Sequence, residues 1–508
     1  MSGADALRQS FLPRKFSVRD YRRLLIIHSC GNGTGPHRPT TMTGPRTSIG
    51  VHVSRIVLLI ALTFAAGARI MLAQQAPPCS LPQHSSAAVQ PHLSLRARKE
   101  VFEKVWRDIR DHYYDSSLNG VNWVDVHTRY RPLIEAAKDD QQFYSLMSQM
   151  TAELHDAHTR FNSPEQWKNF KRQQGVGSGI SVDEVDGEAV VTAVRRDSSA
   201  AYAGIEPGMV ILSIDDKPIA ERVAEIENSR PPSSSERATR MLSYGRLFAG
   251  PPDSEMRLAL ERADGSRFDA TLKRQIYSSA PDVSTDVLTS GNAYIRFDGF
   301  QPEITKEFRQ ALERFRNAPG LVIDLRRNGG GDLGVLLPIA SYFFDKKTLF
   351  AKDRTRSGKP LSEFAGIFRL PLELYVGRPG DQIYSGPVVI LVDARSASSS
   401  EVFAAGMQDS RRAKIVGSQS CGCVLGIAKP RVMRGGGVLE MSEVLWFSPK
   451  GRKLEGTGIL PDENVAPTLS DLQKKHDPAI EAADRALVQM TASTRRWSRS
   501  LDHGKRNP

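Results

Sequence analysis

The stretch PVVILVDARSASSSEVFAAGMQD, residues 387–409, joins an apolar run to a helical pattern through a serine-rich turn. The run 388–392 predicts a buried strand, and SEVFAAGMQD predicts a helix. A strand that leads directly into a helix is the repeating unit of parallel sheets, in which sites form beyond the carboxyl ends of the strands. We therefore predict an α/β domain with this turn at its functional edge.

The same alternation extends from residue 292 to about 465, with further strand patterns NAYIRF and GLVIDLR and the helical pattern TKEFRQALERFRNA. A second turn, DLRRNGGGDLG at 324–334, follows one of these strands. Its glycines leave backbone N–H groups free, as an oxyanion hole requires. The serine turn can supply a nucleophile, although a serine that only caps the helix, with Glu401 completing a capping box, is the alternative.

Helical patterns precede this domain. RKEVFEKVWRDIRDHYYD and FYSLMSQMTAELHDAHTRF carry apolar residues at three- and four-residue steps. They predict a helical domain over 95–170, whose last helix delivers His155 and His158 to a chain reversal. We expect His155 to be solvated or packed rather than functional.

From Gly175 the pattern changes to short strands with glycine-rich turns, over GVGSGISVDEVDGEAVVTAVRRDSSAAYAGIEPGMVILSIDDKPI. This stretch resembles a PDZ domain in the circularly permuted form of bacterial proteases, and we assign 171–275 to it. The resemblance implies that the loop turns backbone N–H groups towards the C-terminal carboxylate of a peptide that adds a strand to the sheet. An ordinary glycine turn in another β domain is the alternative. The loop consists of Gly177, Ser178, Gly179 and Ile180.

The first 76 residues predict a leader and signal peptide. Arg46 and Arg55 precede the apolar run 56–68, which is too short to span a bilayer comfortably. Residues 77–94 form a Pro/Ser/Gln-rich linker, and Met42 is our expected true start. The chain is therefore expected to be exported, periplasmic or extracellular. An uncleaved leader that anchors it to a membrane is the alternative, and no other membrane contact is predicted.

The net charge of +12 does not predict a nucleic-acid partner. Residues 1–73 hold ten Lys and Arg against two acids, a net charge of +8, so the remaining 435 residues carry +4.

The cysteines give no disulfide framework, because an odd number remains once Cys30 leaves with the leader: Cys79, Cys421 and Cys423. In a strand, Cys421 and Cys423 would lie about 6.6 Å apart, near the upper limit for a disulfide. We expect packing there, with no metal or organic cofactor.

Two motifs carry a family resemblance. DLRRNGGG resembles the D-L-R-x-N-x-G-G motif, and SASSSE the S-A-S-A-S-E motif, of the carboxy-terminal processing peptidases, the tail-specific serine proteases. The resemblance implies Ser398 as nucleophile, with the N–H groups of Gly330 and Ser399 as oxyanion donors. It also implies a multidomain α+β fold: helical domain, PDZ-like domain, and a 276–470 core of the ClpP/crotonase-like type with a largely parallel sheet. A C-terminal helix and basic tail, 471–508, would follow.

The chain departs from this family at the general base. Where most members read T-F-G-K-G, the position of the lysine is Cys423, and a usual glutamine is Ile427. A tricorn-like branch uses a histidine in a D-x-H-[ST] turn and a glutamate before a closing G-V-x-P-D motif. HDAHTRF places His158 in such a turn, and KLEGTGILPDENV places Glu455 before such a motif. The resemblance implies His158 as base, with Glu455 orienting it or binding substrate.

Two functions from different classes follow. The first is a serine endopeptidase that captures extended or unfolded polypeptides by their C-termini and hydrolyses them. The second, suggested by the missing lysine, is a catalytically inactive peptide-binding adaptor with a protease-like fold. Both need protein or peptide partners, and the sequence does not determine the oligomeric state.

Overall fold

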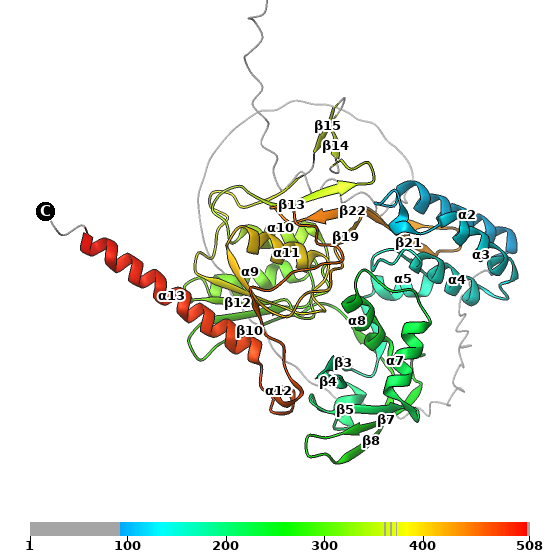
Figure 1. Ribbon diagram of the computed structural model, residues 1–508, viewed down its shortest axis with the longest axis horizontal. Helices are drawn as coiled ribbons and strands as arrows, with labels where there is room; N and C mark the ends of the chain where they lie inside the picture. The colour runs from blue at the N-terminus through cyan, green and yellow to red at the C-terminus, as the bar shows by residue number, and fades with distance from the viewer. Residues whose placement is uncertain (1–91, 360–361, 366–367, 372, 505–508) are drawn as a thin grey trace, which may run out of the picture. The chain divides into compact units, whose positions relative to one another are not determined.

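The computed structural model describes residues 92–359, 362–365, 368–371 and 373–504 (Figure 1). The predicted leader, its apolar run and most of the predicted linker lie outside the described residues, as do Cys30 and Cys79. Among the residues that are described, no helix combines the length and the apolar character needed to cross a membrane.

The helical region begins with α2, whose N-terminus is capped by the Ser94 side chain, and α4 is capped in the same way by Asp139. Because α4 ends at Ala152, His155 and His158 lie in the loop that follows it, as predicted. The elements are α2 (Leu95–His112), η1 (Leu118–Gly120), α3 (Trp123–Ala136), α4 (Asp140–Ala152), β1 (Arg160–Asn162) and α5 (Pro164–Lys171).

A distant segment completes the apolar cluster of these helices. Met433, Leu439 and Met441 are buried among the α2, α3 and α4 side chains, and β1 pairs with β21. They belong to or flank the hairpin of β20 (Arg431–Val432) and β21 (Val438–Glu440). The segment that the sequence analysis placed in the 276–470 core therefore contributes to the helical region.

The next region is a β structure closed by the pairing of β2 with β9. Its main sheet has the order β3-β4-β5-β7-β8, so β3 is an edge strand, and α8 contacts it. The elements are β2 (Gln174–Gly177), β3 (Ile180–Val185), β4 (Glu188–Val194), α6 (Ser199–Tyr202), β5 (Val210–Ile214), β6 (Lys217–Pro218), α7 (Ile219–Asn228), α8 (Glu236–Arg246), β7 (Glu255–Glu261), β8 (Arg267–Lys273) and β9 (Gln275–Ser278).

The α/β core contains a six-stranded sheet in the order β10-β11-β12-β17-β18-β23. All neighbouring strands are parallel except β10, which pairs antiparallel with β11 at one edge. Strands of a sheet covered on both faces are apolar throughout, and every residue of β17 is buried. The strands are β10 (Val283–Val287), β11 (Ala293–Phe297), β12 (Leu321–Asp324), β17 (Val388–Val392), β18 (Ala413–Gly417) and β23 (Glu463–Asn464).

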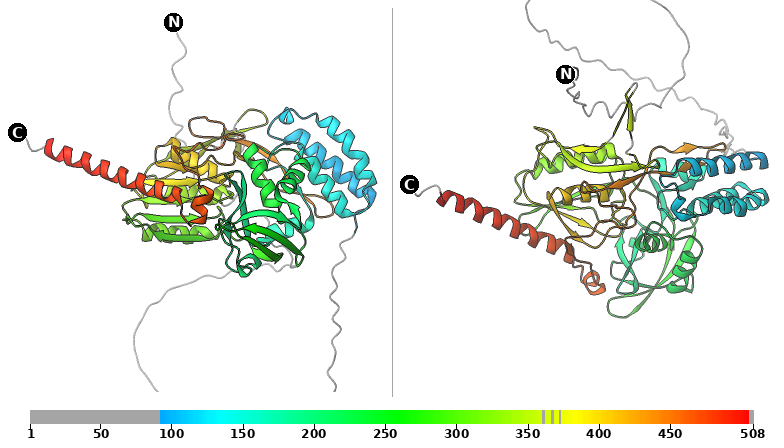
Figure 2. Two further views of the ribbon diagram at one scale, coloured as in Figure 1. Left: turned by 60° about the horizontal axis from the view of Figure 1, so that its bottom comes forward. Right: turned by 45° about the horizontal axis from the view of Figure 1, so that its top comes forward.

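Helices cover both faces of this sheet. Side chains of α9 (Ile304–Arg314), α10 (Leu333–Ser341) and α11 (Ser399–Asp409) pack with alternate strand residues on one face. On the other face lies α13 (Pro478–Gly504) (Figure 1). Four of its alanines pack against the strands. The helix continues past the sheet (Figure 2). The predicted C-terminal helix thus forms the second covering layer of the core.

A second, antiparallel sheet packs beside α11 in the order β16-β13-β22-β19, and it was not predicted. The loop between β13 and β16 carries a two-stranded hairpin. The remaining elements are β13 (Thr348–Thr355), β14 (Ser362–Ala365), β15 (Phe368–Pro371), β16 (Leu374–Val376), β19 (Leu425–Ile427), β22 (Ser442–Phe447) and α12 (Leu469–Gln473).

The order of the core sheet brings the two predicted turns together. β12 and β17 are parallel neighbours, so the turn after Asp324 and the turn after Val392 lie at the same edge. This is the edge of a parallel sheet at which functional sites form.

Candidate active site

Ser398 lies at the N-terminus of α11 in a strained backbone conformation, with φ 56° and ψ −120°. Such a conformation costs about 1–3 kcal/mol in a non-glycine residue and persists where the surroundings impose it. Here its N–H donates to the Cys423 carbonyl oxygen at 2.8 Å and to Glu401 Oε2 at 3.1 Å. Two buried acceptors therefore hold the predicted nucleophile in this geometry.

Gly330 permits the close approach of the second turn. Its φ is +98°, and a Cβ at this position would lie 2.6 Å from Ser398 Cβ and 2.8 Å from the Ala397 carbonyl oxygen. Because both atoms belong to the neighbouring turn, a larger residue would push the two turns apart. The structure therefore brings Gly330 directly against Ser398.

Asn328 joins the two turns through its side chain. Its Oδ1 accepts hydrogen bonds from the Gly330 N–H at 3.0 Å and from Ser400 Oγ at 2.7 Å, and its Nδ2 donates to the Phe297 carbonyl oxygen. The predicted oxyanion donor Gly330 is thus engaged with Asn328 in this structure. The N–H of Ser399, by contrast, has no hydrogen-bond acceptor among the described residues.

Glu401 is the buried centre of the hydrogen bonds beneath Ser398. Besides the Ser398 N–H, its carboxylate accepts Ser420 Oγ at 2.5 Å, the Gly422 N–H at 2.7 Å and the Cys423 N–H at 3.0 Å. Burial raises the pKa of Glu401 to about 7, against the opposing effect of these donors. The helix and the C-G-C segment are consequently fixed to one carboxyl group.

Cys421 and Cys423 form a disulfide, which corrects the expectation of two unpaired packing cysteines. The 6.6 Å expectation assumed a strand, but Gly422 has φ +75° and the Cα atoms are 5.2 Å apart. Both cysteines are buried, at 0% and 2% exposure, in a small cluster. Packed with them are Ala157, Ala238, Met241 and Ala397.

That cluster brings the predicted base and nucleophile turns to one place, since Ala157 precedes His158 and Ala397 precedes Ser398. His158 is half-buried, and its Nδ1 is enclosed with no hydrogen-bond partner in the described part of the chain. Burial lowers the pKa of His158 to about 4, although Asp156 acts in the opposite direction. The imidazole is therefore neutral at neutral pH.

Glu455 is buried near this turn but forms no hydrogen bond to His158 among the described residues. Its Oε2 accepts the Val424 N–H at 2.6 Å, and its carboxyl interacts with the Ser234 side chain. Burial raises the pKa of Glu455 to about 8. Ser234 Oγ also accepts the Ala157 N–H at 2.9 Å, so Glu455 lies one side chain away from the histidine turn.

Two family models match segments of the chain. Residues 291–465 match the model of peptidase family S41, and residues 95–152 match that of the tricorn protease C1 domain. The chain contains a peptidase family S41 domain. Family S41 consists of serine-type peptidases, so this S41 peptidase acts on proteins or peptides.

Relatives of the S41 peptidase include two carboxyl-terminal-processing proteases. That of Synechocystis sp. is 27% identical over 413 residues, which are 78% of this chain and 88% of the relative. That of Picosynechococcus sp. is 28% identical over 429 residues, covering 79% of this chain and 94% of the relative. The match over most of both chains supports a carboxyl-terminal-processing serine protease family.

Solved structures share the mixed helix-and-sheet fold. A photosystem II D1 C-terminal processing protease has a TM-score of 0.50 at 22% identity, over 74% of this chain and 97% of that chain. Mature CPAF has a TM-score of 0.61 at 14% identity, over 78% of this chain and 98% of that chain. At these identities the likeness establishes the fold of the S41 peptidase, with its N-terminal helical region.

The predicted peptide-binding loop of the S41 peptidase runs from the end of β2 to the start of β3. The N–H groups of Ser178 and Gly179 have no acceptor among the described residues, and the buried Ser178 hydroxyl has no partner there. On edge strand β3, Arg395 from the serine turn donates to the Val182 carbonyl oxygen at 2.7 Å and pairs with Asp183. The β region and the serine turn are therefore in direct contact.

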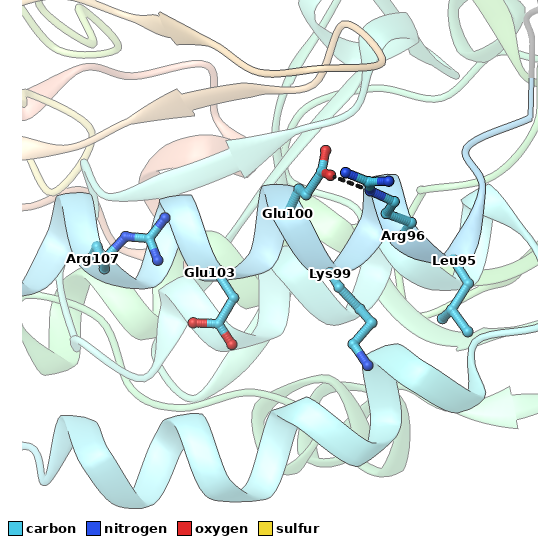
Figure 3. A pocket seen from close by; sticks show the side chains of 6 residues that line it. All are labelled: Leu95, Arg96, Lys99, Glu100, Glu103 and Arg107. Atoms are coloured by element: carbon cyan, nitrogen blue, oxygen red, sulfur yellow. Dashed lines mark hydrogen bonds and ion pairs between the residues drawn. The ribbon is translucent and has the colours of Figure 1, made fainter.

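A surface depression of the S41 peptidase lies away from these turns, along α2 (Figure 3). Most of its charged side chains form ion pairs, as Arg96 does with Glu100 and Lys99 with Glu135. It contains none of the predicted site residues. The side chains that line it are Leu95, Arg96, Lys99, Glu100, Glu103 and Arg107.

Three residues that organise the site were not predicted from the sequence: Asn328, Asp156 and Ser234. Asn328 stands in the D-L-R-x-N motif, and Asp156 stands in the D-x-H turn, so motif positions could have indicated both. Ser234 lies 77 positions from Ala157, in a serine run without a distinguishing pattern. Only the folded chain identifies it.

Proposed function

We propose that this S41 peptidase is an exported endopeptidase in which Ser398 is the nucleophile and His158 is the general base. The observation that carries the proposal is the strained Ser398, held against Gly330 with the Ser399 N–H unoccupied beside it. A serine presented on a strained turn at a helix N-terminus, next to a free backbone donor, is suited to attack on a carbonyl.

The reaction would follow the two steps of acyl transfer. Ser398 Oγ attacks the peptide carbonyl carbon while its proton passes to His158, and the imidazolium then protonates the leaving amine as the C–N bond breaks. Water attacks the resulting ester and gives its proton to His158, which returns it to Ser398 Oγ as the ester C–O bond breaks and the carboxylic acid product leaves. The neutral imidazole, favoured by the lowered pKa of His158, is the form that accepts the first proton.

The oxyanion would be held by two N–H groups. That of Ser399 is unoccupied, whereas that of Gly330 donates to Asn328 Oδ1 and must turn from this acceptor to the oxyanion. Glu455 would act through its surroundings, since among the described residues it hydrogen-bonds to Val424 and Ser234 and not to the imidazole.

We further propose that the β region is a PDZ-like domain that captures the C-terminus of a substrate. The unoccupied N–H groups of Ser178 and Gly179 support it, because such groups bind a terminal carboxylate. Edge strand β3 supports it too, since an extended peptide can add to a free edge. A peptide that pairs along β3 would have to take the Val182 carbonyl from Arg395.

Export is supported by two observations. The sequence contains the signal-like run 56–68, and the site contains a buried disulfide, which persists in oxidising compartments.

For the core, the parallel sheet with helices on both faces supports the ClpP/crotonase-like assignment.

A fluorophosphonate probe tests the nucleophile, because it modifies only an activated serine. We expect stoichiometric labelling of the wild type and none of Ser398→Ala, with Ser396→Ala as a matched control in the same turn. Absence of labelling in folded wild type would favour the second function, a peptide-binding adaptor on an inactive core.

A further inference from the structure

The structure assigns a positioning role to Asp156: we propose that its carboxylate fixes the turn that carries His158 and stabilises the imidazolium during the reaction. This inference rests on the proposed role of His158 as the base. It differs from the sequence-based expectation, in which Glu455 was the carboxylate associated with the histidine.

Both oxygens of Asp156 are fully used. Oδ1 accepts the N–H of His158 at 2.7 Å, the N–H of Thr159 at 2.6 Å and Ser442 Oγ at 3.0 Å. Oδ2 accepts the Tyr113 hydroxyl at 2.7 Å. The residue is 8% exposed, so these protein groups replace the water that a carboxylate would otherwise bind. Because Asp156 accepts the N–H groups of both His158 and Thr159, it fixes the backbone from which the imidazole side chain extends.

The donors come from different parts of the fold. Tyr113 follows α2, and its own hydroxyl accepts a hydrogen bond from Asn119 Nδ2 at 2.8 Å. Ser442 begins β22 of the core, and its N–H donates to Thr159 Oγ1 at 3.1 Å. Asp156 therefore fixes the turn to the helical region and to the core at once.

Glu455 cannot supply the same contacts. It reaches the turn only through Ser234, which accepts the N–H of Ala157, and its nearest backbone partner is Val424 on the other side. Of the two buried carboxyl groups, only Asp156 accepts a hydrogen bond from His158 itself.

The charges around His158 also indicate that Asp156 is the group that stabilises the imidazolium. Arg160 in β1 and Glu440 in β21 also act on the imidazole, but they pair with each other at 2.7 Å, and their effects on its pKa are opposite. Asp156 makes no ion pair within the described residues, so its charge remains available to the imidazolium. Its effect raises the pKa of His158 against the larger lowering by burial.

The test variant is Asp156→Asn, which keeps an oxygen for the two N–H donors and removes the charge. We expect kcat on a reporter peptide to fall about 10- to 100-fold with KM within about twofold, because the contacts of the substrate do not change. The acid limb of the kcat/KM profile should move to lower pH, since removing the negative charge lowers the pKa of His158. A residue that is only structural would leave this limb in place.

Ser442→Ala and Tyr113→Phe are the matched controls. Each removes one donor and keeps the carboxylate, so we expect a smaller loss of kcat and an unshifted acid limb. If Asp156→Asn does not fold, as judged by thermal unfolding, the Ser442→Ala/Tyr113→Phe double variant replaces it, with an expected several-fold loss of kcat at unchanged KM.

Wild-type kcat and an unshifted acid limb in folded Asp156→Asn would overturn the inference. If Asp156→Asn does not fold, unchanged kcat in the Ser442→Ala/Tyr113→Phe double variant would overturn it instead. Full activity of His158→Ala would overturn the proposed function instead. The two failures are therefore separate results.

Discussion

The Ser398 turn and the His158 turn are built in different ways. Around Ser398, the partners Cys423, Glu401 and Asn328 belong to the same α/β core, and most lie in its two motif-bearing turns. Around His158, the hydrogen bonds come from the end of α2, from the β region and from β22. The hydrogen bonds at Ser398 thus come from the core alone, whereas those of the His158 turn come from three regions.

This difference predicts that damage to the His158 turn leaves the Ser398 turn intact. His158→Ala should lower kcat/KM by on the order of 10³-fold, while the fold around Ser398 and its thermal stability remain near wild type. Kinetics on one peptide, with calorimetry for each variant, measure this. Cys423→Lys in that background should not restore activity, since position 423 is buried against the disulfide partner. Full activity of His158→Ala would contradict the general-base role of His158 and would leave the nucleophile role of Ser398 to the labelling experiment.

The next largest effect concerns the β region, which contacts both turns. If the Ser178 and Gly179 N–H groups bind a carboxylate, amidation of a peptide's C-terminus should weaken its binding about 10-fold, because a charge-assisted acceptor is lost. Fluorescence anisotropy with Ser398→Ala measures it without turnover. Equal Kd values for the acid and the amide would reject carboxylate capture and leave the peptidase assignment untouched.

A smaller effect is expected on the pH dependence of stability, through the buried carboxyl groups of the two turns. Burial raises the pKa of Glu455 from 4.5 to about 8, so its protonated form is favoured by folding. The free energy of unfolding should therefore fall as pH rises from about 4.5 to about 8, and Glu401 contributes in the same direction up to about 7. We expect Glu455→Gln to show a smaller drop in Tm between about pH 5 and about pH 8.5. The same drop in both proteins would contradict the raised pKa.

The smallest effect is expected at the disulfide. Cys421→Ala/Cys423→Ala should change kcat less than about threefold, because Glu401 still accepts the N–H groups of residues 422 and 423. A modest decrease in Tm should accompany it, since the bridge closes a very short loop. Steady-state kinetics and calorimetry test the pair, and a loss comparable to that of His158→Ala would place the bridge among the essential parts of the site.

The same contrast explains what could be predicted from the sequence. The strands that flank Asp324 and Asp393 are continuous apolar runs, and both turns follow them, so periodicity and motif spacing placed Gly330 beside Ser398. The partners of the His158 turn could not be placed, because Ser234 and Ser442 meet it only through tertiary packing. The Cys421–Cys423 bridge was missed because the left-handed Gly422 is not visible in residue spacing.

The β20–β21 hairpin has a consequence for how the chain folds. Tyr144 in α4 donates a hydrogen bond to the Gly435 carbonyl oxygen, 291 positions later, and the same hairpin covers the apolar side of the first helices. At about 5–20 residues per second, the ribosome needs roughly 15–60 s to add the missing cover. During that interval β1 lacks its partner strand and exposes Phe161, which is buried in the finished protein. A nascent chain that stops before residue 431 is thus expected to bind chaperones and to be cut readily by proteases within residues 95–162.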